Sequence, residues 1–311
     1  MATTEQLQER IKELKKSKKA IILAHYYTRP EVQQVADFVG DSLQLARAAQ
    51  GTDADIILFA GVHFMGETAK VLSPDKKVLI PDPEAGCSLA DSCPADDFAR
   101  FIEAHPGHTV VSYVNTSVAV KALTDIVCTS SNALQVVRSI PESTPVIFGP
   151  DRNLGSYIKS MTGRKNMVIW DGACHVHERF SLEAILRLKS EHPRARVLVH
   201  PECKQQIVLI ADRVGSTAAL LDYARKSDAD EFIVVTEPGI IFKMQEACPD
   251  KRFIPAPPAD SSCACNDCSY MKLITLPKII DTLENELNAI EIPEEVAKKA
   301  IKPILRMLEI K

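Results

Sequence analysis

Short, unbroken apolar runs alternate with longer amphipathic stretches along most of the chain. The run AIILA at residues 20–24 is rich in branched side chains, and comparable runs occupy 109–114 and 196–200. Unbroken runs of this length are typical of parallel strands that are buried on both faces. Strands that alternate with helical stretches predict βαβ units with right-handed crossovers.

Four features recur three times in the same order, with a period of about 87 residues. The first is an apolar run that ends in polar residues, near His25, Tyr113 and His200, at spacings of 88 and 87. The second is a turn of small residues that opens a helix, at Ser42, Ser130 and Ser216. A further strand with its turn follows, and then a last strand that leads to Cys87, Cys174 and a cysteine cluster ending at Cys268.

This repetition predicts an α/β fold of three repeated three-layer α/β/α domains with short parallel sheets around a pseudo-threefold axis. We expect the domains to span residues 1–87, 88–174 and 175–271, with the C-terminal helices of 272–311 packed on the first. Ligands of parallel α/β units bind beyond the carboxyl ends of the strands. The three strand-end cysteines are therefore expected to meet at a shared centre.

Composition and charge exclude several classes of function. The 311 residues carry a formal net charge of −4 and no strongly basic stretch, so nucleic acid is not expected as a partner. The first 20 residues are polar and charged, and no segment reaches the ~18 consecutive apolar residues of a membrane span. We therefore expect a cytoplasmic protein without a membrane partner.

Nine cysteines in a reducing compartment favour metal binding, redox chemistry or burial over a disulfide framework. Cys263, Cys265 and Cys268 lie within six positions, and the pair Cys265 and Cys268 by itself could be a zinc half-site or a redox dithiol. Four other cysteines are expected to be structural: Cys93, Cys128, Cys203 and Cys248.

Three convergent thiolates could hold either of two metal groups. Zinc takes four protein ligands, or three with an open water position. A [4Fe–4S] cluster usually takes four thiolates, so a three-cysteine cluster would keep one iron open as a Lewis acid. The residues alone leave both possibilities open.

Several segments together resemble the quinolinate synthase family of bacterial and plant NAD biosynthesis, over residues 10 to 310. They are AHYYTRPEVQQVADFVGDSLQLARAA, FGPDRNLG, HPEC, VGSTAALL, TEPGIIFKMQ and CSYMKLITL. The resemblance implies three α/β/α domains and a [4Fe–4S] cluster on Cys87, Cys174 and Cys268. Cys268 is chosen because the family ligand stands three residues before a methionine, here Met271. Ser262 replaces the first cysteine of a run that some members oxidise, which puts a redox role of Cys263 and Cys265 in doubt.

The resemblance also implies a reaction and its partners. The family is a transferase that condenses iminoaspartate with dihydroxyacetone phosphate to give quinolinate, phosphate and two waters. It works beside L-aspartate oxidase or aspartate dehydrogenase, which supply iminoaspartate.

The substrates carry one phosphate and two carboxylates, and each repeat offers a Ser/Thr-rich helix N-terminus that could bind an anion. These positions are Ser42, Ser130 with Ser131, and Ser216 with Thr217. The alternative is that they only cap helices. We expect Tyr27 and Glu202 to form an acid/base pair. His25, a further catalytic candidate, and His200 would hold substrate oxygens, Tyr113 and Asn115 would bind a carboxylate, and His177 would face the substrate.

Two other classes of function stay open at this stage. A zinc-dependent aldolase or hydrolase could use the same scaffold, and the identity of the metal would separate it from an iron–sulfur enzyme. A phosphometabolite-binding protein without catalysis is the third possibility, and replacing Glu202 would separate it from both enzymes.

Overall fold

The structure, a computed structural model, describes residues 2–259 and 266–310. Cys263 and Cys265, and with them the question of a redox disulfide, lie outside the described residues. Among the helices of the described ranges, none has the length and apolar character that crossing a membrane requires.

Three four-stranded sheets, all parallel, form the framework of the fold. The first has the order β2-β1-β3-β4 and contains β1 (Ala20–His25), β2 (Phe38–Gly40), β3 (Ile56–Ala60) and β4 (Lys77–Leu79). The second has the order β6-β5-β7-β8, from β5 (Thr109–Tyr113), β6 (Ile126–Cys128), β7 (Val146–Gly149) and β8 (Met167–Ile169). The third has the order β10-β9-β11-β12, from β9 (Arg196–Val199), β10 (Arg213–Val214), β11 (Glu231–Val235) and β12 (Arg252–Pro255). One strand order in all three sheets confirms the predicted repeated α/β fold.

Helices connect the strands and cover the sheets. The first unit contains α1 (Thr4–Ser17), α2 (Pro30–Val35), α3 (Ser42–Gly51), α4 (His63–Leu72) and α5 (Ser88–Asp91). The second contains α6 (Ala95–Glu103), α7 (Val118–Lys121), α8 (Ala133–Arg138), α9 (Arg152–Thr162) and α10 (His175–Glu178). The third contains α11 (Leu182–Glu191), α12 (Gln205–Val208), α13 (Thr217–Lys226) and α14 (Ile240–Ala247). The chain ends with the 3₁₀ helix η1 (Met271–Leu273), α15 (Leu276–Asn285) and α16 (Glu294–Glu309).

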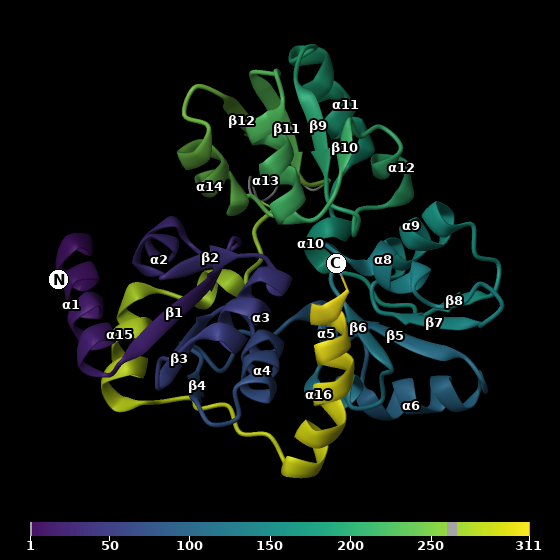
Figure 1. Cartoon of the computed structure of the whole chain (residues 1–311). Coiled ribbons are helices and arrows are strands. Elements are labelled where there is room, and N and C mark those ends of the chain that lie inside the picture. The colour runs from purple at the N-terminus through teal and green to yellow at the C-terminus, as the bar shows by residue number, and fades with distance from the viewer. Residues whose placement is uncertain (1, 260–265, 311) are drawn as a thin grey trace.

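The three units lie around a common centre, with the short helix α10 near the middle of the view (Figure 1). The central strands are apolar on both faces, and all five residues of β3 are buried. Such strands cannot face water, so each unit must cover both faces of its sheet with helices. That the units fold as domains with boundaries at residues 87, 174 and 271 stays a prediction.

One hydrogen bond between an aspartate and the backbone recurs in each unit, and the sequence did not predict it. In each, an aspartate Oδ2 accepts a 2.8 Å hydrogen bond from the backbone N–H of a residue 15 positions earlier, on the first strand. The pairs are Asp37 with Ile22, Asp125 with Val110, and Asp212 with Val197. The same contact at equivalent positions is independent support for the repeat.

The two C-terminal helices pack on different neighbours. Helix α15 contacts α1 and β3 of the first unit. Helix α16 contacts α4 of the first unit but also α7 and β6 of the second, so it spans the junction between them rather than covering the first unit alone. Helix α16 continues through Pro303. Its packed face is fully buried at Ala300, Ile304 and Met307.

Candidate active site

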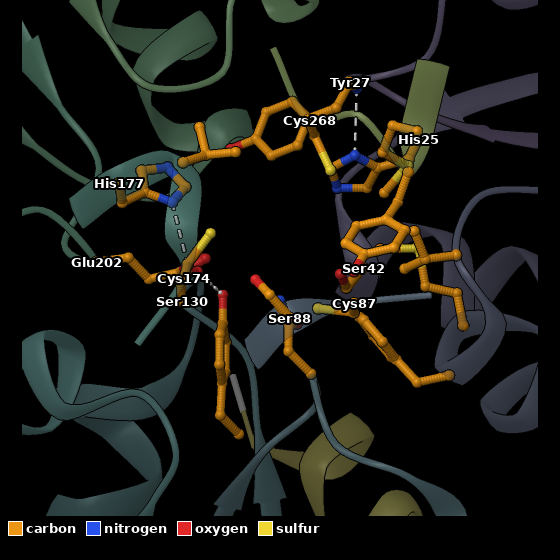
Figure 2. A pocket seen from close by; sticks show the side chains of 18 of the residues that line it. His25, Tyr27, Ser42, Cys87, Ser88, Ser130, Cys174, His177, Glu202 and Cys268 are labelled. Carbon is orange, nitrogen blue, oxygen red and sulfur yellow. Dashed lines mark hydrogen bonds and ion pairs between the residues drawn. The ribbon is translucent and has the colours of Figure 1, made fainter. Parts of the chain in front are cut away.

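A cavity lies where the three units and the C-terminal segment meet (Figure 2). It is lined by nearly all of the residues that the sequence nominated, most of which follow the end of a strand. They are His25, Tyr27, Ser42, Cys87, Tyr113, Asn115, Ser130, Cys174, His177, His200, Glu202, Thr217 and Cys268. The convergence expected from the repeat is therefore observed.

The three predicted cysteine ligands come from three different parts of the chain. Cys87 precedes α5, Cys174 precedes α10, and Cys268 precedes η1. None of them is paired in a disulfide. Burial raises the pKa of Cys87 to about 12 and that of Cys268 to about 11, and it raises the pKa of Cys174 well above the ordinary value. The metal-free thiols are therefore protonated at neutral pH, and a metal that binds them must displace protons.

Glu202 is a buried carboxylate with two partners on different elements. The Tyr113 hydroxyl donates a 2.6 Å hydrogen bond to its Oε1, and His177 Nδ1 lies 3.2 Å from its Oε2. Burial on its own raises the pKa of Glu202, but the nearby His177, followed by His200 and Tyr113, lowers it to about 2. The group is therefore ionised at neutral pH.

The Tyr27 hydroxyl contacts Thr236 rather than Glu202. Tyr27 Oη lies 2.7 Å from Thr236 Oγ1, and His177 Nε2 lies 3.0 Å from the same oxygen. Burial raises the pKa of Tyr27 well above the ordinary value, so the phenol is protonated. Tyr27 and Glu202, the expected acid/base pair, do not share a hydrogen bond: Tyr113 donates to Glu202 instead. Tyr27 and Glu202 are instead connected through Thr236 and His177.

Thr236, which contacts both Tyr27 and His177, was not predicted from the sequence. It directly follows β11, the position in the repeat where a strand ends and a polar residue begins. Its position after a strand was the one feature that could have indicated a role. A threonine side chain alone does not indicate one until its neighbours are known.

Two buried histidines complete the polar wall. Burial lowers the pKa of both His25 and His200 to about 3, so both imidazoles are neutral near pH 7. His200 Nε2 lies 3.2 Å from Ser130 Oγ, and its ring stacks on that of His177 with centroids 4.7 Å apart. Neutral imidazoles can donate or accept a hydrogen bond, so they suit substrate oxygens of either kind.

The small-residue turns divide into capping residues and cavity residues. Ser42 and Thr217 are the first residues of α3 and α13, and both line the cavity. Ser216 is not among the cavity-lining residues: it caps α13 by accepting a hydrogen bond from the Ala219 N–H. Ser131 Oγ lies 2.8 Å from Ser216 Oγ and donates to Asp41 Oδ2 at 2.6 Å, joining three helix starts.

Replacing Ser216 by alanine is expected to lower the free energy of unfolding by about 1 kcal/mol, because the cap is lost and the Ala219 N–H keeps no partner. The matched control is Ser42→Ala, since Ser42 stands one residue inside its helix, behind the cap Asp41. The midpoint of urea unfolding measures both. Equal midpoints for the two variants would contradict the division between capping and cavity serines.

A second donor set lies inside the same cavity. Ligand atoms of Cys174, His177 and Glu202 all lie within 4.8 Å of one another, close enough to hold one metal ion. A thiolate, an imidazole and a carboxylate are ligands that zinc accepts. A metal ion at this site would use only Cys174 of the three cysteines, so Cys87 and Cys268 would not be metal ligands.

Comparison with known proteins gives one consistent result. The family described as quinolinate synthetase A protein matches residues 9–309. The chain is 56% identical to a quinolinate synthase of Nostoc punctiforme over 300 residues, which covers 96% of this chain and 92% of the relative. It is 55% identical to a quinolinate synthase of Thermosynechococcus vestitus, with 96% of this chain and 94% of the relative covered.

Proposed function

We propose that the chain, which belongs to the quinolinate synthetase A family, condenses iminoaspartate with dihydroxyacetone phosphate to give quinolinate, phosphate and two waters. The observation that carries this proposal is one cavity lined by three unpaired cysteines together with an ionised carboxylate, three tyrosines and four histidines. The iminoaspartate would come from L-aspartate oxidase or aspartate dehydrogenase in the cytoplasm.

The donor set fits a [4Fe–4S] cluster held by Cys87, Cys174 and Cys268. Three separate thiols line the cavity, each is free of a disulfide, and no fourth cysteine is among the residues described there. Held by these three thiolates, such a cluster would keep one iron without a protein ligand and would supply Lewis-acid chemistry toward substrate oxygens.

The polar groups of the cavity suit anionic substrates. The N-termini of α3 and α13, two helices of ten residues each, present Ser42 and Thr217 to the cavity. Backbone N–H groups and partial positive charge at a helix start favour a phosphate or a carboxylate. Asn115 Oδ1 is buried without a hydrogen-bond partner, which supports a role in binding a ligand.

Proton transfer would use the ionised Glu202 as a base and the protonated Tyr27 as an acid. The contacts from Tyr27 through Thr236 and His177 to Glu202 offer a route by which a proton taken up at one end is replaced at the other. Neutral His25 and His200 would orient substrate oxygens, and Tyr113 holds Glu202 in place through its hydrogen bond.

The direct test is product formation by the metal-loaded chain without oxygen. Dihydroxyacetone phosphate is supplied together with iminoaspartate that L-aspartate oxidase generates in the vessel, with fumarate as the electron acceptor in place of oxygen. We expect quinolinate and phosphate to appear in equal amounts, measured by liquid chromatography and a phosphate assay. A protein that holds its cluster and yields no quinolinate would overturn the proposal.

Replacing Tyr27 by phenylalanine is expected to lower kcat by ~10²-fold or more, with a smaller change in KM, because the acid is lost while the ring remains. Tyr26→Phe is the matched control. Its hydroxyl contacts Gln44 at 3.3 Å and it does not line the cavity. Equal kcat values for the two variants would remove Tyr27 from the mechanism.

A further inference from the structure

Glu237 is completely buried beside the third cysteine, and the roles proposed above do not use it. Its Oε1 accepts hydrogen bonds from the backbone N–H of Cys268 at 3.2 Å and from Lys272 Nζ at 2.7 Å. Its Oε2 accepts a 2.7 Å bond from the Gly239 N–H. Lys272 Nζ also donates to the Tyr27 carbonyl at 2.7 Å, so this carboxylate connects the cysteine segment with the first and third units.

Asp151 has the same relation to the second cysteine. It is completely buried, and its Oδ2 accepts a 3.0 Å hydrogen bond from the backbone N–H of Cys174. Its Oδ1 accepts from Asn153 N and Leu154 N at the start of α9. In each carboxylate, one oxygen therefore accepts hydrogen bonds from the start of its own helix or turn, and the other accepts the backbone N–H of a cysteine.

The two carboxylates occupy equivalent positions of the repeat. Asp151 is the second residue after β7, and Glu237 is the second residue after β11. The corresponding residue after β3 is Val62, whose side chain has no hydrogen-bond acceptor. In the first unit the cysteine loop is instead held between backbone groups, with the His63 N–H donating to the Ala85 carbonyl at 2.8 Å.

We propose that Asp151 and Glu237 are positioning residues that fix the main chain of Cys174 and Cys268, and with it the direction in which each thiol enters the cavity. The inference rests on the proposed cluster. Each carboxyl group is fully buried and is held by further hydrogen bonds of its own, so the oxygen that accepts the cysteine N–H is fixed in place. Residues that orient metal ligands typically contribute 10- to 100-fold to metal affinity.

The test uses Asp151→Asn and Glu237→Gln, which keep the shape of each side chain but replace one acceptor oxygen by an NH₂ group. Matched controls are Asp125→Asn in the second unit and Asp212→Asn in the third. Each control removes a carboxylate that also accepts a backbone N–H but does not line the cavity. After anaerobic reconstitution, the rate of iron loss to the chelator ferrozine is measured for all four variants. We expect ~10- to 100-fold faster loss for the two test variants and the parent rate for the controls.

A second readout does not need the cluster. In the metal-free chain, alkylation by iodoacetamide is followed peptide by peptide. Glu237→Gln should accelerate labelling of Cys268, and Asp151→Asn that of Cys174, while labelling of Cys87 stays at the parent rate. A purely structural defect would change all three thiols together, so a uniform change or no change would overturn the proposal.

Two further outcomes keep the test decisive. If Glu237→Gln does not fold, Glu237→Asp keeps the carboxyl group but shortens the reach by one methylene, and a parent rate of iron loss in that variant would overturn the assignment of Glu237. If the parent chain binds no iron and sulfide, the proposed function fails. The alkylation pattern of the metal-free chain still decides whether the carboxylates position the cysteines.

Discussion

Replacing Glu202 by glutamine is expected to lower kcat for quinolinate formation by ~10²- to 10⁴-fold, the usual contribution of a positioned acid or base. The carboxylate is buried, accepts a hydrogen bond from Tyr113, and is ionised because His177, His200 and Tyr113 together outweigh the effect of burial on its pKa. Glutamine has a similar shape but cannot take up a proton. Steady-state kinetics on protein of equal iron content measure the change.

The control for this prediction is Glu178→Gln. Glu178 belongs to α10, accepts a 2.7 Å hydrogen bond from Asn153, and does not line the cavity. It should retain kcat close to that of the parent. Full activity of the Glu202→Gln variant would exclude a catalytic role for this residue. A parent chain that binds both substrates without turning them over would favour a binding protein.

Single replacements of Cys87, Cys174 or Cys268 by alanine should each abolish the cluster. Protein purified without oxygen is expected to hold about four iron and four sulfide per chain, and each variant should lose most of both together with the visible absorption of the cluster. The reason is geometric: the three thiols come from separate parts of the chain, and among the described residues no other cysteine lines the cavity. Metal and sulfide analysis with an optical spectrum measures the loss.

Two replacements serve as controls for the cysteine series. Cys248→Ser changes a cysteine at the end of α14 that does not line the cavity. Cys263→Ala tests directly whether the first cysteine of the C-terminal cluster is a ligand. Both should keep iron and sulfide. Zinc in a one-to-one ratio without sulfide would instead favour the donor set of Cys174, His177 and Glu202, and with it a zinc enzyme.

The framework was readable in the sequence because of how its strands are buried. Central strands such as β3 and β11 lie between helices, so their residues must be apolar in succession, and this produces a pattern that survives weak sequence identity between repeats. The edge strands β2, β6 and β10 were not predicted. They have only two or three residues, and the residues of β2 and β10 are in part exposed. Two or three residues are too few to form a recognisable strand pattern.

The candidate site was predicted only as far as strand ends could locate it. Residues such as His25, Tyr113 and Glu202 combine a strand-end position with reactive chemistry, and they do line the cavity. Their partners depend on contacts between units, which no local pattern encodes. The spacing of residues along the chain could not reveal that Glu202 meets Tyr113 across 89 positions while Tyr27 meets Thr236 across 209.

The distribution of the three cysteines over the repeats has a consequence for biosynthesis. Cys87, Cys174 and Cys268 are separated by 87 and 94 residues, so a growing chain has no complete set until most of it has been synthesised. Domains of a large protein generally fold in order from the N-terminus. Early units therefore expose reactive thiols before the last one arrives, and helix α16, which joins the first two units, arrives later still. A metal group held by these three cysteines would therefore be loaded only after most of the chain has been synthesised, and a chain that ends before Cys268 would lack it.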